Sequence, residues 1–332
     1  MEKEQEEMQF LGVLGIYTES YKIIWSCRKI FSQITLSLIL PLSFVFLAHI
    51  QVSNLFFYKI RHDQFLQHIT PPGTKRHDKL SDLVSSDWAL FWLFKFLYFT
   101  FLLALSLLST AAVVYTVASV YTAREVTFRT VIAVVPKVWK RLMLTFLCSY
   151  STLLLYNAVA LLILILWAVT LAFTVAGTVV FFSILILYSV GFVYMTVVWQ
   201  LASVVSVLEE FYGFRAMVKS KELIKGKTWV TVAIFFKLNF SLVAIHILFR
   251  ILVVQADSVG VLGRIGFGIL SFMLLCKLFL FGLVIQTVIY LVCKSHHHEN
   301  IDKSALSDHL EVYLGEYVPL KAKDVQLEQF HV

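Results

Sequence analysis

The chain has 332 residues, of which 59% are hydrophobic and only 15% are charged, and its formal net charge is +7. Soluble domains are about 45–50% apolar and about 25% charged, so this composition excludes an ordinary soluble domain. Between Arg141 and Glu209 there is no Asp, Glu, Lys or Arg. Such a gap holds two apolar spans of about 20 residues each, joined by a short connection. We therefore predict an all-α, polytopic integral membrane protein, built as a helical bundle.

Segment 1–16 is acidic ("MEKEQEEM") and lacks a basic region followed by an apolar one, so we expect no cleavable signal peptide there. Six spans then follow in chain order, at about 31–53, 88–119, 142–171, 177–208, 229–254 and 267–293. We expect segment 54–87 to form an extracytosolic loop. The polar tail 294–332 is expected to be cytosolic and is a candidate docking segment for protein partners.

Basic residues gather before the first, third and fifth spans, and they set the expected orientation. These residues are Arg28, Lys29, Lys137, Lys140, Arg141, Lys219, Lys221, Lys225 and Lys227. The opposite connections are nearly neutral, apart from the mixed charges of 54–87. The positive-inside rule therefore predicts that both termini are cytosolic. We interpret the net charge as a signal of topology and of contact with an anionic lipid leaflet, and not of nucleic-acid binding.

The three basic segments share a pattern: a basic residue, one spacer and an aromatic residue, at Lys29-x-Phe31, Lys137-x-Trp139 and Lys227-x-Trp229. A cation beside an interfacial ring is typical of a surface helix that turns into a membrane. We predict three juxtamembrane amphipathic helices, the second ended by Pro136 and the third by Gly226. The membrane domain 17–293 then divides into three repeats of a surface helix plus a hairpin, at 17–119, 122–208 and 211–293. Generic juxtamembrane chemistry is the alternative explanation.

Five polar residues inside the spans are candidate functional residues: Lys237, Asn239, His246, Arg250 and Lys277. The spacing of Asn239, His246 and Arg250 places them on one helical face, which could line a crevice for an anion. Alternatively, Asn239 and His246 bond to neighbouring helices. Lys95 follows Trp88 and Trp92 and is expected to snorkel to the interface. No Asp or Glu lies within a predicted span, which disfavours a proton relay or cation-coupled transport.

Other motifs do not indicate catalysis, a metal or a cofactor. The "HHHE" run from His296 to Glu299 lacks the geometry of a zinc site, because adjacent histidines point in different directions. No H-E-x-x-H, G-x-S-x-G, P-loop or G-x-G-x-x-G occurs. Cys27 and Cys293 lie beside predicted spans, where S-palmitoylation competes with unmodified thiols as an interpretation. We expect a protein that is not an enzyme.

The stretches "YKIIWSCRKIFSQITLSLILPLSF" and "SVLEEFYGFRAMVKSKELIKGKTW" resemble an uncharacterised family of plant polytopic membrane proteins. A more distant similarity is to the membrane domain that accompanies some bacterial glycerophosphodiesterases. The resemblance implies a plant endomembrane or plasma-membrane protein, and it brings no catalytic residues to this chain. Some plant members carry labels that suggest a polyadenylate-binding-protein partner, which nothing in these residues supports.

Together, these patterns favour a non-enzymatic protein that organises membrane or partner proteins and contacts anionic lipid. The rival is a transporter or channel for an anionic or amphiphilic solute, which would use the five polar span residues. Lipid-modifying catalysis is a third possibility, and it needs acids or a metal that the sequence does not place.

Overall fold

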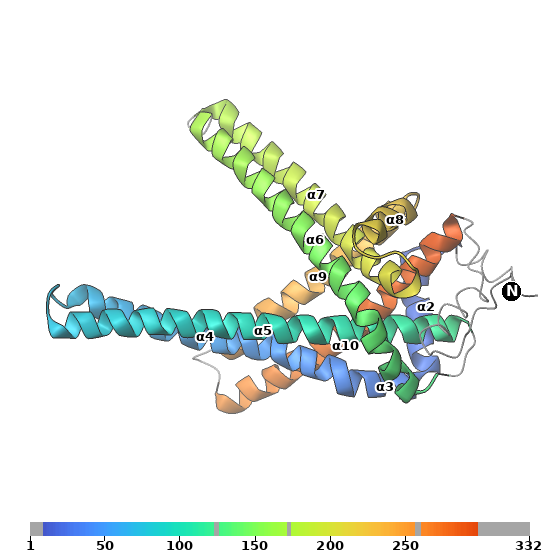
Figure 1. Ribbon diagram of the computed structural model, residues 1–332, viewed down its shortest axis with the longest axis horizontal. Helices are drawn as coiled ribbons and strands as arrows, with labels where there is room; N and C mark the ends of the chain where they lie inside the picture. The colour runs from blue at the N-terminus through green and yellow to red at the C-terminus, as the bar shows by residue number, and fades with distance from the viewer. Residues whose placement is uncertain (1–8, 123–125, 171–173, 256–259, 298–332) are drawn as a thin grey trace, which may run out of the picture.

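The computed structural model describes residues 9–122, 126–170, 174–255 and 260–297, and the chain in these ranges is helical without strands (Figure 1). The helices are α2 (Val13–Ser26), α3 (Arg28–Ile34), α4 (Leu40–Ile69), α5 (Lys75–Tyr121), α6 (Phe128–Thr170), α7 (Val175–Leu208), α8 (Phe214–Ile224), α9 (Thr228–Phe249) and α10 (Val261–His296), with π-helical turns η1 (Thr35–Ile39) and η2 (Arg250–Val254). Six of the helical segments are long and apolar enough to cross a membrane. The all-α class and the six apolar spans are thus confirmed. The acidic residues 1–8 and the tail from 298 onward lie outside the described residues.

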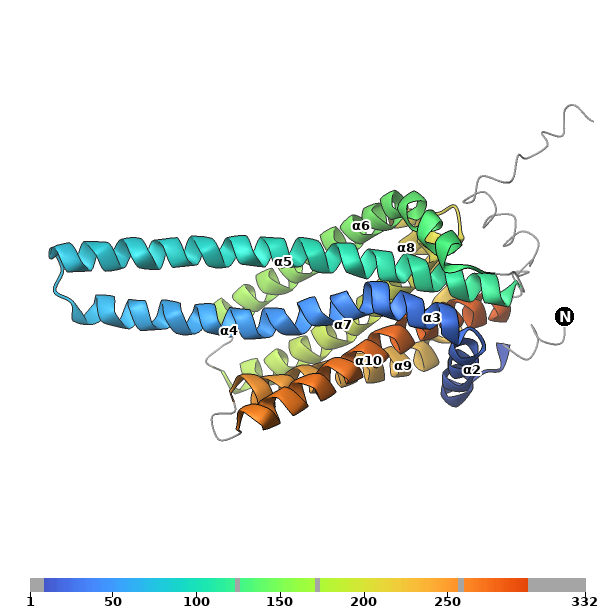
Figure 2. The same cartoon turned by 90° about the horizontal axis from the view of Figure 1, so that it is seen from below.

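The long helices form three hairpins, α4–α5, α6–α7 and α9–α10, which meet at one end and diverge toward the other (Figures 1 and 2). We call the end where they meet the base; α2, α3, α8 and the C-terminal end of α10 all lie there. Each predicted repeat contains one of these hairpins. Whether the three units are related as repeats stays a prediction.

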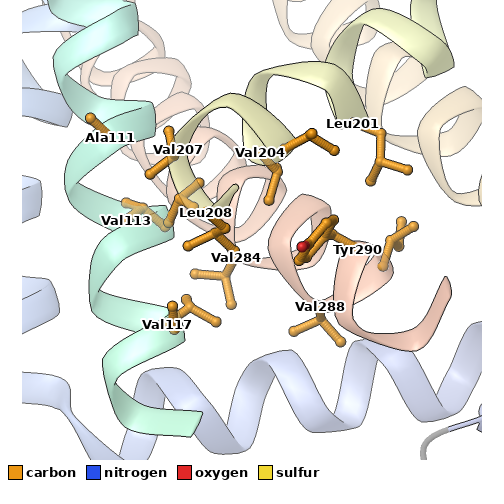
Figure 3. Close-up of a cluster of buried hydrophobic side chains, with 14 of the residues drawn as sticks. Ala111, Val113, Val117, Leu201, Val204, Val207, Leu208, Val284, Val288 and Tyr290 are labelled. Carbon is orange, nitrogen blue, oxygen red and sulfur yellow. The ribbon is translucent and has the colours of Figure 1, made fainter. Parts of the chain in front are cut away.

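The base is held together by close packing of small and β-branched side chains from three helices (Figure 3). Val117 of α5, Val204 of α7 and Val284 of α10 are each 0% exposed, and Val288 is 1% exposed. Such residues lose little side-chain freedom and let helix backbones approach closely, which favours helix association where the hydrophobic effect between helices is weak. The base is therefore a closely packed part of the bundle.

Away from the base, the diverging hairpins expose apolar surface. In the most apolar 18-residue stretch of α6, 0% of the residues are buried, and in that of α7 6% are buried. A soluble monomer rarely exposes an apolar patch of more than a few hundred Å², so this surface fits an apolar surrounding.

Polar groups within the α6–α7 hairpin satisfy one another. The Tyr156 hydroxyl donates to the Tyr188 carbonyl at 2.8 Å, the Tyr188 hydroxyl donates to Asn157 Oδ1 at 2.8 Å, and Trp167 Nε1 donates to the Gly177 carbonyl at 2.8 Å. Because these bonds stay inside the hairpin, it can project alone into hydrocarbon without leaving these groups unpaired.

The segment 54–87 corrects our expectation of a loop, because it is helical except for a short turn. α4 continues to Ile69 and α5 begins at Lys75, so the hairpin extends beyond the expected spans. The turn holds Pro71, Pro72 and Gly73, whose φ of 85° suits glycine. Lys59 and Asp87 join the two helices by an ion pair of 2.6 Å. We call this extension, residues 54–87, the stalk.

The expected surface helices are corrected in part. α2 and α8 are separate short helices, and α8 ends at Ile224 just before Gly226, whose φ is 89°. The second expected surface helix is instead continuous with its span, since α6 runs through Pro136. The reason is tertiary: the residues Val131, Val134, Val135, Val138 and Leu142 form one buried stripe that crosses the proline. Packing of this stripe outweighs the cost of an interior proline, about 3 kcal/mol.

Candidate functional site

A seam of buried polar side chains lies between α7 and α10, and it is the candidate functional site. Gln286, Tyr290 and Lys294 follow one another at four-residue spacing on α10, so they share one helical face. Their partners are the backbone carbonyl of Gln200 and the Ser203 side chain, both on α7, and the side chain of Glu209, which directly follows α7. The contacts join positions 81 to 86 residues apart in the chain.

At the basal end of the seam, Glu209 accepts two hydrogen bonds on one oxygen. The Tyr290 hydroxyl donates to Glu209 Oε1 at 2.5 Å, and Lys294 Nζ donates to the same atom at 2.9 Å. Lys294 Nζ also lies 3.2 Å from the Tyr290 hydroxyl. The side chains of Lys294 and Glu209 are only 20% and 11% exposed. This partly buried ion pair fixes the end of α7 against α10.

Further from the base, Gln286 continues the seam. Its Nε2 donates to Ser203 Oγ at 2.7 Å and to the backbone carbonyl of Gln200. Gln286 is 7% exposed, so these bonds satisfy an amide that would otherwise be buried without partners.

A second set of buried hydroxyls ties α8 to the base. Thr145 Oγ1 and Ser206 Oγ lie 2.7 Å apart, and the backbone N–H of Gly213 donates to Thr145 Oγ1 at 2.8 Å. Gly213 has a φ of 63°, which glycine adopts readily. Ser220 Oγ of α8 donates to the Val198 carbonyl at 2.8 Å. α8 is therefore fastened to α6 and α7 by hydrogen bonds as well as by apolar contacts.

Two cavities open beside the seam, between α7, α9 and α10. The smaller has a volume of about 150 Å³ and includes Gln200, Asn239 and Gln286 in its lining. The larger has a volume of about 360 Å³ and is lined mainly by apolar side chains of α7 and α9. Phe235 and Asn239 line both, so the two cavities adjoin.

The nine predicted basic residues lie on α3, in the first part of α6, on α8 and in the turn between α8 and α9. Arg28, Lys29, Lys137, Lys140, Lys221 and Lys225 are exposed, and Arg141, Lys219 and Lys227 are half-buried. These segments all belong to the base (Figures 1 and 2), so the fold brings three separate parts of the sequence to one end of the molecule.

The five predicted intramembrane residues are not brought together. Asn239 lines the smaller cavity, whereas His246 meets Phe46 of α4 with ring centroids 6.1 Å apart. Residues on the same face of α9 thus contact different neighbouring helices at different positions along α9. Arg250 and Lys277 are exposed. Their surroundings therefore differ, and the crevice that we considered for Asn239, His246 and Arg250 stays a prediction.

Lys237 is also exposed, and its side chain reaches toward α2. Its Nζ lies 5.1 Å from the ring centroid of Tyr17, which stacks on Phe281 with a centroid distance of 5.6 Å. Burial raises the pKa of the Tyr17 hydroxyl. The contact directs the ammonium toward the base and explains how a lysine is accommodated so far along α9.

The sequence interpretation missed the partners of Lys95. Its Nζ lies 2.6 Å from His49 Nε2 and donates to Ser53 Oγ at 3.0 Å, so Lys95 is held against α4 and does not simply snorkel. His49 stacks on Tyr98 with ring centroids 3.7 Å apart. His49 and Ser53 are four residues apart in the first span, and this spacing could have identified them.

Two further expectations concern thiols and metals. Cys293 is 0% exposed, so an acyl chain cannot attach there without opening the packing, whereas Cys27 is half-buried.

The rings of His296 and His297 are 5.6 Å apart and nearly perpendicular, and the rest of the "HHHE" run lies outside the described residues. Within the part of the chain that the structure describes, no group of three or more His, Cys, Asp or Glu side chains is placed to hold a metal ion.

The fold and this seam define a class: an all-helical protein with six helices of membrane-spanning length and composition. A family model described as "Domain of unknown function (DUF8558)" matches residues 1–330, and the chain belongs to this family. The comparison with curated proteins found no match, and neither did the comparison with solved structures.

Proposed function

We propose that the protein is a multi-pass, non-enzymatic membrane protein that organises membrane or partner proteins and contacts anionic lipid through its base. The observation that carries this proposal is the gathering of basic side chains from α3, α6, α8 and the turn after α8 at one end of the bundle. Because each basic residue near an anionic surface contributes about 1 kcal/mol, several together give a strong preference for anionic lipid.

Aromatic side chains support the same placement. Trp25 is 62% exposed and Trp229 is 87% exposed, both at the base. The Arg28 guanidinium lies 5.9 Å from the centroid of the Trp25 ring. Exposed tryptophans beside cations are typical of the membrane–water interface, where the ring sits at the level of the head groups.

The orientation and location are part of the proposal. The positive-inside rule supports a cytosolic base with both termini in the cytosol, in the endomembrane system or plasma membrane of a plant. The stalk then projects on the opposite side. Residues 298–332 supply a cytosolic segment for protein partners.

The rival proposal, transport of an anionic or amphiphilic solute, loses its original motivation. It required Lys237, Lys277 and the polar face of α9 to line one continuous cavity. Lys237 and Lys277 lie on exposed surface, and the smaller cavity includes only Asn239 of the five predicted residues.

Charge reversal at the base tests the proposed function. The triple variant Lys140→Glu, Lys221→Glu and Lys225→Glu changes only exposed side chains. After extraction from membranes with equal phosphatidylserine and phosphatidylcholine, native mass spectrometry measures the ratio of the two lipids retained. We expect this ratio to fall at least about tenfold, since three contributions of about 1 kcal/mol are lost.

The matched control reverses three exposed charges at the tip of the stalk. Lys75→Glu, Arg76→Glu and Lys79→Glu should leave the retained lipid ratio unchanged, because these residues lie at the far end from the base. Equal phosphatidylserine retention by the basal variant and the unmodified protein would refute the proposed role of the base.

A further inference from the structure

The two adjoining cavities between α7, α9 and α10 differ in their chemistry. We call the smaller one, of about 150 Å³, the amide recess, because three of its lining residues, Gln200, Asn239 and Gln286, have side-chain amides. We call the larger one, of about 360 Å³, the apolar groove; it is lined by Phe192, Val193, Thr196, Val197, Phe235, Phe236, Asn239, Phe240 and Val243. Ligand pockets in proteins have volumes of about 300–1,000 Å³, and the two spaces together fall within this range.

Neither space has a charged side chain in its lining. The Thr196 hydroxyl in the groove donates to the Phe192 carbonyl of its own helix at 2.9 Å, so it offers little to a ligand. The groove is thus apolar in effect, and hydrogen-bonding capacity is concentrated in the recess. A ligand that fits both must combine a hydrocarbon body with an uncharged polar head.

The side-chain amides of the three recess residues differ in whether they form hydrogen bonds within the chain. Gln286 Nε2 is bonded to Ser203, and Asn239 Nδ2 donates to the Phe235 carbonyl at 2.8 Å. By contrast, no hydrogen bond joins the half-buried side-chain amide of Gln200 to another residue in the part of the chain that the structure describes. An amide in contact with hydrocarbon costs free energy unless it forms a hydrogen bond. The Gln200 amide is therefore available to form a hydrogen bond with a bound molecule.

The positions of the lining residues along α7 indicate which end of a bound ligand would face the base. Gln200 lies nearer to the basal end of α7 at Leu208 than do Phe192 and Val193 of the groove. On α9 the two linings cover nearly the same stretch, 235–242 for the recess and 235–243 for the groove. The recess is therefore offset toward the base along α7.

We propose that the amide recess and the apolar groove form one binding site for a lipid with an uncharged, hydrogen-bonding head. The hydroxyl of a diacylglycerol or of a sterol has this chemistry. The head bonds to the Gln200 amide in the recess, and the hydrocarbon body lies in the groove between α7 and α9, directed away from the base. A charged head is disfavoured, because it would be desolvated in a lining that offers no counter-charge.

The test uses the full chain reconstituted in phosphatidylcholine nanodiscs. Two probes carry a photoreactive group in the hydrocarbon part: a diacylglycerol and a sterol. A photoreactive fatty acid serves as the charged comparison. After illumination, mass spectrometry of peptides locates the labels. We expect saturable labelling of 192–197 and 236–243 by at least one neutral probe, and the probe that labels identifies the source of the hydroxyl.

Two variants separate the head from the body of the ligand. Gln200→Leu removes the unpaired amide and should lower labelling about fivefold, the effect of losing one hydrogen bond. Val243→Trp places a large ring at the exposed edge of the groove and should abolish labelling there. Asn157→Leu is the matched control, since it removes an amide from the α6–α7 hairpin away from both cavities, and should leave labelling unchanged.

Labelling that is spread along α6 as much as along the groove, or that neither variant alters, would overturn the proposal, as would equal labelling by the fatty acid. Size-exclusion profiles check that each variant remains folded. The triple charge reversal at the base should not change this labelling, so failure of the proposed function and failure of this site are distinguishable.

Discussion

Replacing Lys294 with methionine should destabilise the base by about 2–3 kcal/mol. Removing one partner of a buried ion pair costs about 3–5 kcal/mol, because the other charge stays buried without compensation. Here the Glu209 side chain is 11% exposed and keeps the hydrogen bond from Tyr290 at 2.5 Å, so we reduce that range for partial solvent screening. Glu209→Gln should cost less, about 1 kcal/mol, because Lys294 lies near the end of α10 and can turn toward water.

Equilibrium unfolding in mixed micelles, with increasing fractions of a denaturing detergent, measures these free energies. The double variant should cost less than the sum of the two single variants, with a coupling of about 1–2 kcal/mol. Lys22→Met is the control, since its ion pair with Glu19 is 3.4 Å long and the lysine side chain is 68% exposed, and it should change stability by less than about 0.5 kcal/mol. A coupling near zero would refute the view that the Glu209–Lys294 contact fixes α7 against α10.

Three other substitutions test the fold by the same unfolding assay. Gly226→Ala should destabilise by about 1–3 kcal/mol, because φ is 89° there and an added Cβ would meet the His296 ring; unchanged stability would contradict this geometry. Pro136→Ala should stabilise α6 by about 1–2 kcal/mol by restoring a backbone hydrogen bond, and a loss of stability would mean that the proline shapes the helix. Lys59→Met should destabilise the stalk, since the 4% exposed Asp87 side chain loses its ion-pair partner, and adding Asp87→Asn should recover part of that loss.

The sequence alone determined which segments are apolar helices. The expected spans 177–208 and 229–254 nearly coincide with α7 and with α9 plus η2, because hydropathy summed over about 20 residues is a local property that needs no knowledge of neighbours. The basic residues were also identified locally, by their positions next to the spans. Gly226 marked the end of α8 correctly, since a positive φ is a constraint on one residue.

Tertiary structure decided which polar residues meet. Gln200 and Gln286 carry no charge and match no motif, so sequence reasoning overlooked them, and Glu209 stood out only as the end of a charge-free gap. Their bonds join positions 81 to 86 residues apart, and such pairings depend on which helix faces which. The helical continuity of α6 through Pro136 likewise follows from its buried stripe and not from local propensity. Local pattern fixes the helices, whereas packing between distant segments fixes their partners, and with them the candidate site.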